Sequence, residues 1–361
     1  MTLSRHPIMC YTRLAYRSHC TMPTFYPFPK IVQFRQVVKN ITHQAQFQGF
    51  GDDGEPIMDR NAKLPTLTFT GTVKIHGTNA GIGWDGEQLW AQSRTRIITP
   101  ESDNYGFAAW VYANKKAIID TLAEWRCIVG TYTPLLVYGE WAGKGINSGA
   151  AICELDKKFY CFDVQSILTE ISPTKPIIIE LAHNADTHCY NPEIGWYRIL
   201  PFTYHLDINF SKPEEAQNDL ARITEEVEKE CPVAKSFGVS GVGEGVVWTA
   251  TYKGKVHRFK VKGEKHSATK VKTLASVDVE LINGIREFVE YAVTENRVKQ
   301  AIQQVCAGAE FDPKSTGKIL SWLVSDIYAE EADTISKNNL QSDSKRLNRE
   351  IANKARSILF S

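Results

Sequence analysis

The stretch Lys74-Ile75-His76-Gly77-Thr78-Asn79 follows directly after the run LTFTGTV at residues 67–73. The enrichment of this run in Thr, Val and Phe predicts a β-strand, and the glycine after it predicts a tight turn. A lysine between a strand and a glycine turn is well placed to direct its amine into a pocket. Taken alone, the pattern more often marks an exposed lysine beside a turn.

Other β-type runs in the chain contain or adjoin residues that can take part in chemistry. Runs rich in Val, Ile, Thr and aromatic residues, bounded by Gly, Pro, Asp or Asn, occur at residues 81–86, 88–93, 134–141, 158–167, 175–182, 245–252 and 256–262. Their number and composition predict antiparallel sheets. The residues of interest at or near the ends of these runs are Arg94, Glu140, Phe162, Glu244, Lys260 and Lys262.

Helical spacing appears between the β-type runs and dominates the end of the chain. Helices are expected at residues 105–124 and 212–230, the second capped by Ser211, and later at residues 279–293, 296–307, 315–331 and 344–359. We therefore predict an α+β class with flanking helices, followed by a small all-α C-terminal domain. The expected domain division is a disordered lead at 1–21, a catalytic domain at 22–272 and a helical domain at 273–361. A linker is expected near residues 265–276 and a loop at 336–344.

The charge of the chain is balanced overall but uneven along its length. The net charge of the 361 residues is only +1, so a nucleic-acid surface has to come from local placement of basic residues. Residues 251–275 hold eight Lys or Arg and only one acidic residue, Glu264. A solvated face is the ordinary meaning of such a run, and its motif context favours nucleic acid.

The eight cysteines contain no CxxC pair, which argues against a disulfide framework and against a zinc ribbon. We therefore expect a reducing compartment and a cytoplasmic location. No apolar run approaches the roughly 18 residues needed to span a bilayer, so we expect no membrane association. The first 51 residues lack Asp and Glu and include several arginines, so an organelle transit peptide is the alternative.

A lysine that attacks the α-phosphorus of a nucleoside triphosphate must first lose its proton. The ordinary lysine pKa of about 10.4 is too high for this at neutral pH. Lys260 and Lys262 alternate with Phe259 and Val261, so they share one strand face. We expect these two cations to lower the pKa of Lys74 and to stabilise phosphate, unless the face is simply solvated.

The remaining residues supply groups that a bound nucleotide requires. Glu140 and Glu244 offer the hard oxygen ligands that magnesium takes, although a surface turn is the alternative for each. Either Phe162 or Tyr160 can stack on a base, with core packing as the alternative. Arg94 can bind a phosphate or an RNA 3′ end, or form a surface ion pair.

The ordered motifs KIHGTN, SR, YGEW, FYCFDV, EGVV and FKVK resemble motifs I, Ia, III, IIIa, IV and V of the covalent nucleotidyltransferases. This superfamily contains DNA ligases, RNA ligases and messenger-RNA capping enzymes. His76 followed by Thr-Asn, and Ala142-Gly143 after the motif III glutamate, resemble the RNA ligase 2 branch, which includes kinetoplastid editing ligases. The resemblance covers residues 67–272.

The resemblance implies an ATP-grasp-like ligase fold and an RNA ligase that uses ATP and Mg²⁺ or Mn²⁺ to join RNA 3′-OH and 5′-phosphate ends. Lys74 would carry the AMP, with Ile75 and His76 beside it in the nucleotide site. Asn79 would contact the nucleotide or the RNA end, and Arg94 a phosphate or ribose.

The same resemblance assigns roles to the later motifs. Glu140 would bind the ribose and, with Glu244, the metal. Phe162 would stack on adenine. Lys260 and Lys262 would contact phosphate during adenylylation and sealing.

Other interpretations remain open. A DNA ligase or a capping guanylyltransferase uses the same scaffold, but the C-terminal residues lack the alternating pattern of the OB-fold that many of those enzymes carry, which favours an RNA ligase. A non-catalytic nucleic-acid-binding protein is the alternative of another class. We expect a monomer, and the segment at residues 165–240 is interpreted as an insertion of unknown role.

Overall fold

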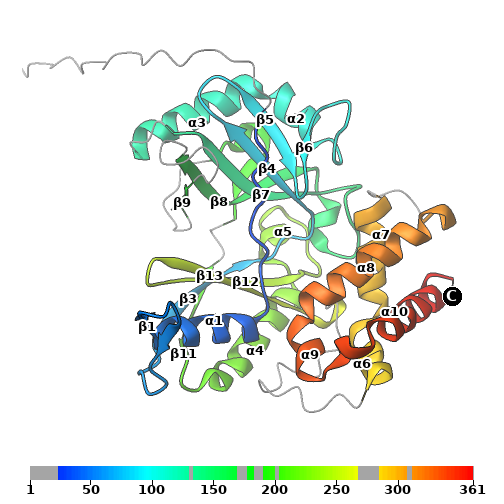
Figure 1. The fold of residues 1–361 in the computed structure, drawn as a ribbon. Coiled ribbons are helices and arrows are strands. Elements are labelled where there is room, and N and C mark those ends of the chain that lie inside the picture. The colour runs from blue at the N-terminus through cyan, green and yellow to red at the C-terminus, as the bar shows by residue number, and fades with distance from the viewer. Residues whose placement is uncertain are drawn as a thin grey trace, which may run out of the picture.

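The structure is a computed structural model that describes residues 23–129, 133–168, 177–182, 190–199, 203–266, 284–306 and 311–360. Two large sheets lie one above the other in the view of Figure 1, and a group of helices formed by the end of the chain lies beside the lower one. The predicted α+β class is confirmed. The lead at 1–21, the linker residues 267–276 and the boundary at 272/273 lie outside the described residues, so the domain division remains a prediction.

The first sheet has the strand order β11-β3-β12-β13 and is antiparallel throughout. Alternation along the last strand buries Phe259 and Val261, and it turns Lys260 and Lys262 to the other face. Two helices pack against the buried face. The bounds are β3 Thr66–Val73, β11 Thr203–Asn209, β12 Gly245–Tyr252, β13 Lys255–Lys262, α1 Phe34–Gln46 and α4 Gln217–Lys229.

The second sheet has the order β10-β8-β7-β4-β5-β6, with β9 paired to β8. Its pairings are antiparallel except that of β10 with β8. Helices α2 and α3 cover it, and their buried residues Phe107 and Trp125 belong to its core. The bounds are β4 Thr78–Trp84, β5 Leu89–Ser93, β6 Ile97–Ile98, β7 Leu135–Ala142, β8 Lys158–Leu168, β9 Ile177–Ala182, β10 Trp196–Arg198, α2 Phe107–Ala113 and α3 Lys115–Val129.

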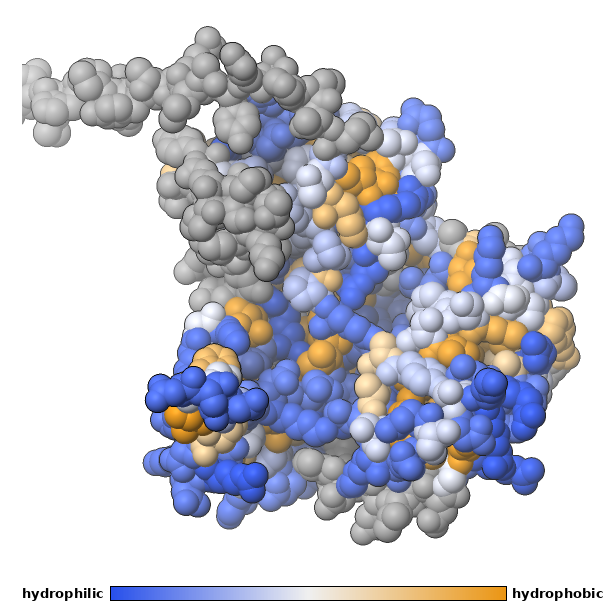
Figure 2. All heavy atoms as spheres, viewed as in Figure 1, coloured by the Kyte–Doolittle hydropathy of each residue, from blue (hydrophilic) through white to orange (hydrophobic). Residues whose placement is uncertain are grey.

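The C-terminal helices form their own core around Phe288, Leu323 and Ile351, all fully buried. They are α6 Ile285–Ala292, α7 Glu295–Cys306, η5 Pro313–Ser315, α8 Thr316–Glu330, α9 Ala332–Lys337, η6 Leu340–Asp343 and α10 Ser344–Leu359. Among the described residues, no helix is long and apolar enough to cross a membrane. On the face shown in Figure 2, hydrophobic residues lie in small groups separated by hydrophilic ones.

Several predicted boundaries were wrong. The helix expected at 105–124 is two helices, because the Asn114 side chain donates to the carbonyl of Trp110 (2.8 Å) and ends α2. Ser211 is not the N-cap of α4, because a short helix η3 (Pro213–Ala216) precedes α4 and places Ala216 at that position. The loop at 336–344 is largely helical, and residues 279–283 of the helix expected at 279–293 lie outside the described residues.

Some elements have no counterpart in the sequence prediction. These include α1, α9, β6, β10 and β11, the hairpin of β1 (Phe47–Phe50) and β2 (Pro56–Met58), and the short helices α5 (Pro232–Ser236), η1 (Ala151–Glu154), η2 (Pro192–Ile194) and η4 (Glu264–His266). Helix α1 is fixed by packing, because Phe34 lies on the buried Phe259 with ring centroids 4.8 Å apart.

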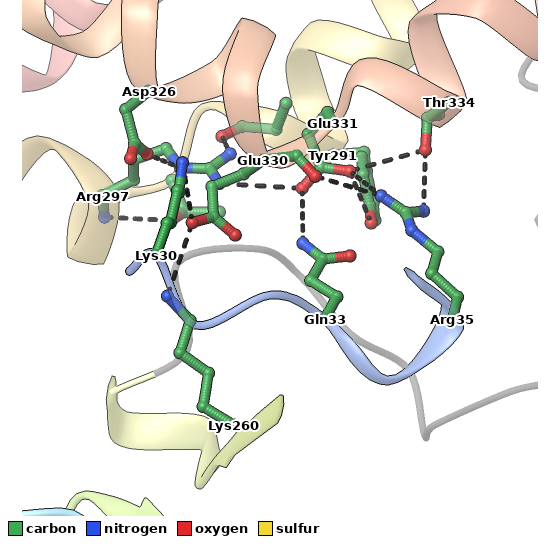
Figure 3. A network of polar contacts seen from close by, with 12 residues as sticks. Lys30, Gln33, Arg35, Lys260, Tyr291, Arg297, Asp326, Glu330, Glu331 and Thr334 are labelled. Carbon is green, nitrogen blue, oxygen red and sulfur yellow. Dashed lines mark hydrogen bonds and ion pairs between the residues drawn. The ribbon is translucent and has the colours of Figure 1, made fainter. Parts of the chain in front are cut away.

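A buried ionic junction ties the C-terminal helices to the beginning of the chain (Figure 3). Glu331 has no exposed side-chain surface and accepts from Arg35 (3.0 Å), with Arg297 3.6 Å away. Gln33 also donates to it (3.4 Å), and Arg35 donates to the hydroxyl of Thr334 (2.8 Å). The position of the helices therefore depends on charges removed from water.

Replacing Glu331 by alanine should leave Arg297 buried with Asp326 as its remaining carboxylate partner. Removing one member of a buried ionic group typically costs about 3–5 kcal/mol, and the remaining partner reduces this to about 2–4 kcal/mol of unfolding free energy. Urea unfolding measures the loss. The control is Glu295→Ala, which breaks the exposed pair with Lys299 and should leave the urea midpoint unchanged. Equal midpoints for both variants would contradict the role of the junction.

Candidate active site

A cavity of about 430 Å³ lies where the two sheets, the start of the chain and the C-terminal helices meet. The first sheet contributes Thr70 and Thr72 from β3 and Lys260 from β13. The second sheet contributes Glu140 from β7 and Phe162 from β8. Lys74 also lines the cavity, and only 20% of its side chain is exposed.

The backbone fixes Lys74 at the end of β3. Its N–H donates to the carbonyl of Gly245 (2.8 Å), which continues the pairing of β3 with β12 by one residue. Gly77 then makes the turn that sequence reasoning expected, and a Cβ there would lie 2.4 Å from the carbonyl oxygen of Trp141. Asn147 donates to the Gly77 carbonyl (2.8 Å). A side chain at residue 77 would thus displace the turn that holds Lys74.

Glu244 is the centre of a buried ion cluster. Its Oε2 accepts from Lys74 Nζ (2.7 Å) and lies 3.2 Å from His76 Nδ1, while its Oε1 is 2.9 Å from Lys262 Nζ. Only 4% of the Glu244 side chain is exposed. Burial opposes its ionisation, but Lys262, Lys74 and His76 together hold its pKa well below the ordinary range.

The pKa of Lys74 is raised, contrary to the expectation from sequence. Burial favours the neutral amine, but the charges of Glu244 and Glu140 outweigh it. Lys262 and Lys260 do not lower the pKa as expected, because each is engaged by a carboxylate: Lys262 by Glu244 and Lys260 by Glu330. In this arrangement the protonated form of Lys74 is therefore favoured.

The predicted site residues fall into two groups. Those that line the cavity are Lys74, Ile75, Asn79, Arg94, Glu140, Phe162 and Lys260. Three others, His76, Glu244 and Lys262, form the ion cluster around the Lys74 amine. Of the two rings considered for base stacking, Tyr160 is buried in the core, whereas Phe162 lines the cavity.

The comparison with known families agrees with this geometry. The sequence model of the RNA ligase family matches residues 67–262, which is more than half of the chain. The chain belongs to the RNA ligase family.

Solved structures similar to this family member include the Naegleria gruberi RNA ligase with PPi, at 16% sequence identity and a TM-score of 0.40. Two mutants of that ligase also match, one with ATP and Mn (16%, TM-score 0.39) and one with AMP and Mn (15%, TM-score 0.38). Each match covers 68% of this chain and 58% of the Naegleria chain, so the similarity spans less than two thirds of that protein.

Glu140 differs from Glu244 in its environment. Burial raises its pKa to about 7, although Lys74 opposes this. Within the described residues, no group of three or more His, Cys, Asp or Glu side chains is arranged to hold a metal ion. Both oxygens of Glu244 already contact cations. Of the two predicted metal ligands, only Glu140 lines the cavity.

Several residues around the cavity of this RNA ligase family member were missed by the sequence analysis. Arg258 had a signal, since it shares the alternating face of Lys260 and Lys262. The others come from segments without any motif. They are Phe28, Lys30 and Ile31 near the start of the chain, and Gln300, Gln304, Trp322, Asp326 and Glu330 from α7 and α8.

The raised pKa of Glu140 predicts a pH dependence of stability. Below about pH 4.5 the carboxyl is protonated in both states, but as the pH rises toward 7 the unfolded chain releases the proton that the folded protein keeps. The wild type should lose about 1–3 kcal/mol over this interval relative to Glu140→Gln. Urea unfolding of both proteins at a series of pH values tests this. A difference that stays constant with pH would refute the assignment.

Proposed function

We propose that this protein is an ATP-dependent RNA ligase that joins RNA 3′-hydroxyl and 5′-phosphate ends through a covalent adenylate on Lys74. The observation that carries the proposal is Lys74 itself, a lysine held by the buried Glu244 at the wall of a cavity with Phe162 and Arg94. Membership of the RNA ligase family supports this choice over a DNA ligase or a capping guanylyltransferase.

The cavity offers a distinct partner for each part of ATP. Phe162 packs edge-on against Phe28, with ring centroids 5.0 Å apart, so adenine would meet an aromatic wall. Glu140 would bind the ribose or the metal. Arg94 and Lys260, which also line the cavity, would bind phosphate, and Asn79 would contact the nucleotide or the RNA end.

The reaction then needs three transfers. Lys74 Nζ loses its proton and bonds to the α-phosphorus as the bond to the bridging oxygen breaks and pyrophosphate leaves. The RNA 5′-phosphate oxygen next attacks this phosphorus and releases Lys74. Finally, the RNA 3′-hydroxyl attacks the 5′-phosphorus, and AMP leaves. Positioning and charge stabilisation supply most of the catalysis in such transfers.

The proton on Lys74 is the first obstacle, because Glu244 and Glu140 stabilise it. A divalent cation held at Glu140 together with the phosphates would neutralise phosphate charge and favour the neutral amine. Glu244 would join the metal only after exchanging its contacts with Lys74 and Lys262. Its present role is to orient the nucleophile.

The assignment of Lys74 predicts that Lys74→Ala and Lys74→Arg both fail to form an adenylate. Alanine has no amine, and the guanidinium of arginine stays protonated. Incubation with labelled ATP and Mg²⁺, followed by denaturing electrophoresis, detects the adduct. Lys116→Ala, which removes an exposed lysine on α3, is the control and should label as the wild type does. Labelling of either Lys74 variant would show that another residue is the nucleophile.

The substrate is tested by offering the wild type nicked RNA, nicked DNA and hybrids with 3′-hydroxyl and 5′-phosphate ends. We expect labelling by ATP rather than GTP, and sealing of substrates with an RNA 3′-hydroxyl strand. Labelling by GTP alone would identify a capping enzyme, and sealing of DNA alone a DNA ligase. Failure to form any adenylate would identify a non-catalytic binding protein.

A further inference from the structure

Two lysines from opposite ends of the catalytic region meet at one carboxylate of the C-terminal helices. Glu330, the last residue of α8, has its Oε1 3.2 Å from Lys30 Nζ and 3.4 Å from Lys260 Nζ. Figure 3 shows both ammonium groups converging on it. All three residues line the cavity that contains Lys74.

The carboxylate is charged and largely removed from solvent. Only 10% of the Glu330 side chain is exposed, against 42% for Lys30 and 25% for Lys260. Burial opposes ionisation, yet Lys260 and Lys30 lower the pKa of Glu330 below its ordinary value. An oxyanion between two ammonium groups has the charge and donor partners of a bound phosphate oxygen.

The stability of α8 does not explain a glutamate at this position. The C-terminal end of a helix carries partial negative charge, so a carboxylate there is unfavourable for α8 itself. Docking already rests on neighbouring contacts, namely Arg35 with Glu331 and Lys39 with Asp333. Docking therefore does not depend on Glu330 alone, and its carboxylate also lines the cavity.

We propose that Lys30 and Lys260 form a phosphate subsite and that Glu330 occupies it in the ligand-free protein, so that Glu330 and a substrate phosphate compete for the same two lysines. This rests on the proposed function and extends it, because Lys30 belongs to no motif and Glu330 comes from outside the matched family region. The phosphate belongs either to the β- and γ-positions of ATP or to the 5′ end of RNA.

The competition is tested by binding rather than by ligation. Glu330→Gln keeps the shape of the side chain and removes its charge. Calorimetric titration with sodium pyrophosphate, and separately with a 5′-phosphorylated oligoribonucleotide compared with its 5′-hydroxyl form, measures the subsite directly. We expect Glu330→Gln to tighten binding of at least one phosphate probe by about 3- to 10-fold. A gain for pyrophosphate alone assigns the subsite to ATP, and a gain for the 5′-phosphate alone assigns it to RNA.

Matched variants separate competition from general disturbance. Lys30→Met should weaken binding of the same probe, and the double variant Lys30→Met/Glu330→Gln should show a smaller gain than Glu330→Gln alone. Lys39→Met is the control, because Lys39 pairs with the nearby Asp333 and does not line the cavity. It should leave binding of both probes unchanged. Glu330→Asp, which shortens the reach and keeps the charge, provides a second test and should tighten binding by less than Glu330→Gln does.

Unchanged or weaker binding of both probes by Glu330→Gln, in protein with a wild-type urea midpoint, overturns the competition. Weaker binding would instead make Glu330 a residue that positions the two lysines. If Glu330→Gln misfolds, the same comparison is made with Glu330→Asp, and unchanged binding there overturns the proposal. The failure of the proposed function would appear separately, as absence of an adenylate in the wild type.

Discussion

The ion cluster around Glu244 is the constraint on which the rest of the site depends. A carboxylate that is 4% exposed must be paired, and it is paired with Lys74, Lys262 and His76 at once. These residues come from the ends of β3, β12 and β13, so the cluster joins the three strands at one edge of the first sheet. The same interaction therefore orients Lys74, the proposed nucleophile, and holds the strand ends together.

The same arrangement opposes deprotonation of Lys74, which the proposed reaction requires. The carboxylates that hold Lys74 in place also raise its pKa, so they favour the protonated amine over the neutral amine that the proposed attack on ATP requires. Under the proposed function, the neutral amine would form when the nucleotide binds, because its phosphates and metal would change the local charge. A site of this kind keeps its amine charged, and hence protected from stray electrophiles, until a nucleotide is bound.

Sequence reasoning found the residues whose chemistry is local and missed those placed by distant packing. Lys74 and Gly77 were recognisable because a strand, a reactive group and a turn are consecutive, and the face shared by Lys260 and Lys262 follows from strand alternation. The partner of each lysine was not predictable, since Glu330 reaches Lys260 across 70 positions of sequence. Helix α1 was missed because its packing on Phe259 fixes its place. The error in the pKa of Lys74 has the same origin, because cations were counted without their carboxylate partners.

The ionic junction also bears on the order in which parts of the protein can fold during synthesis. Arg35 and Glu331 are 296 residues apart, so the carboxylate leaves the ribosome long after the guanidinium does. A chain made from its N-terminus exposes Arg35 and Lys30 long before their carboxylate partners exist. Both sheets precede α8 in the chain, so the wall of the cavity that α8 supplies is added only after the strands have been synthesised.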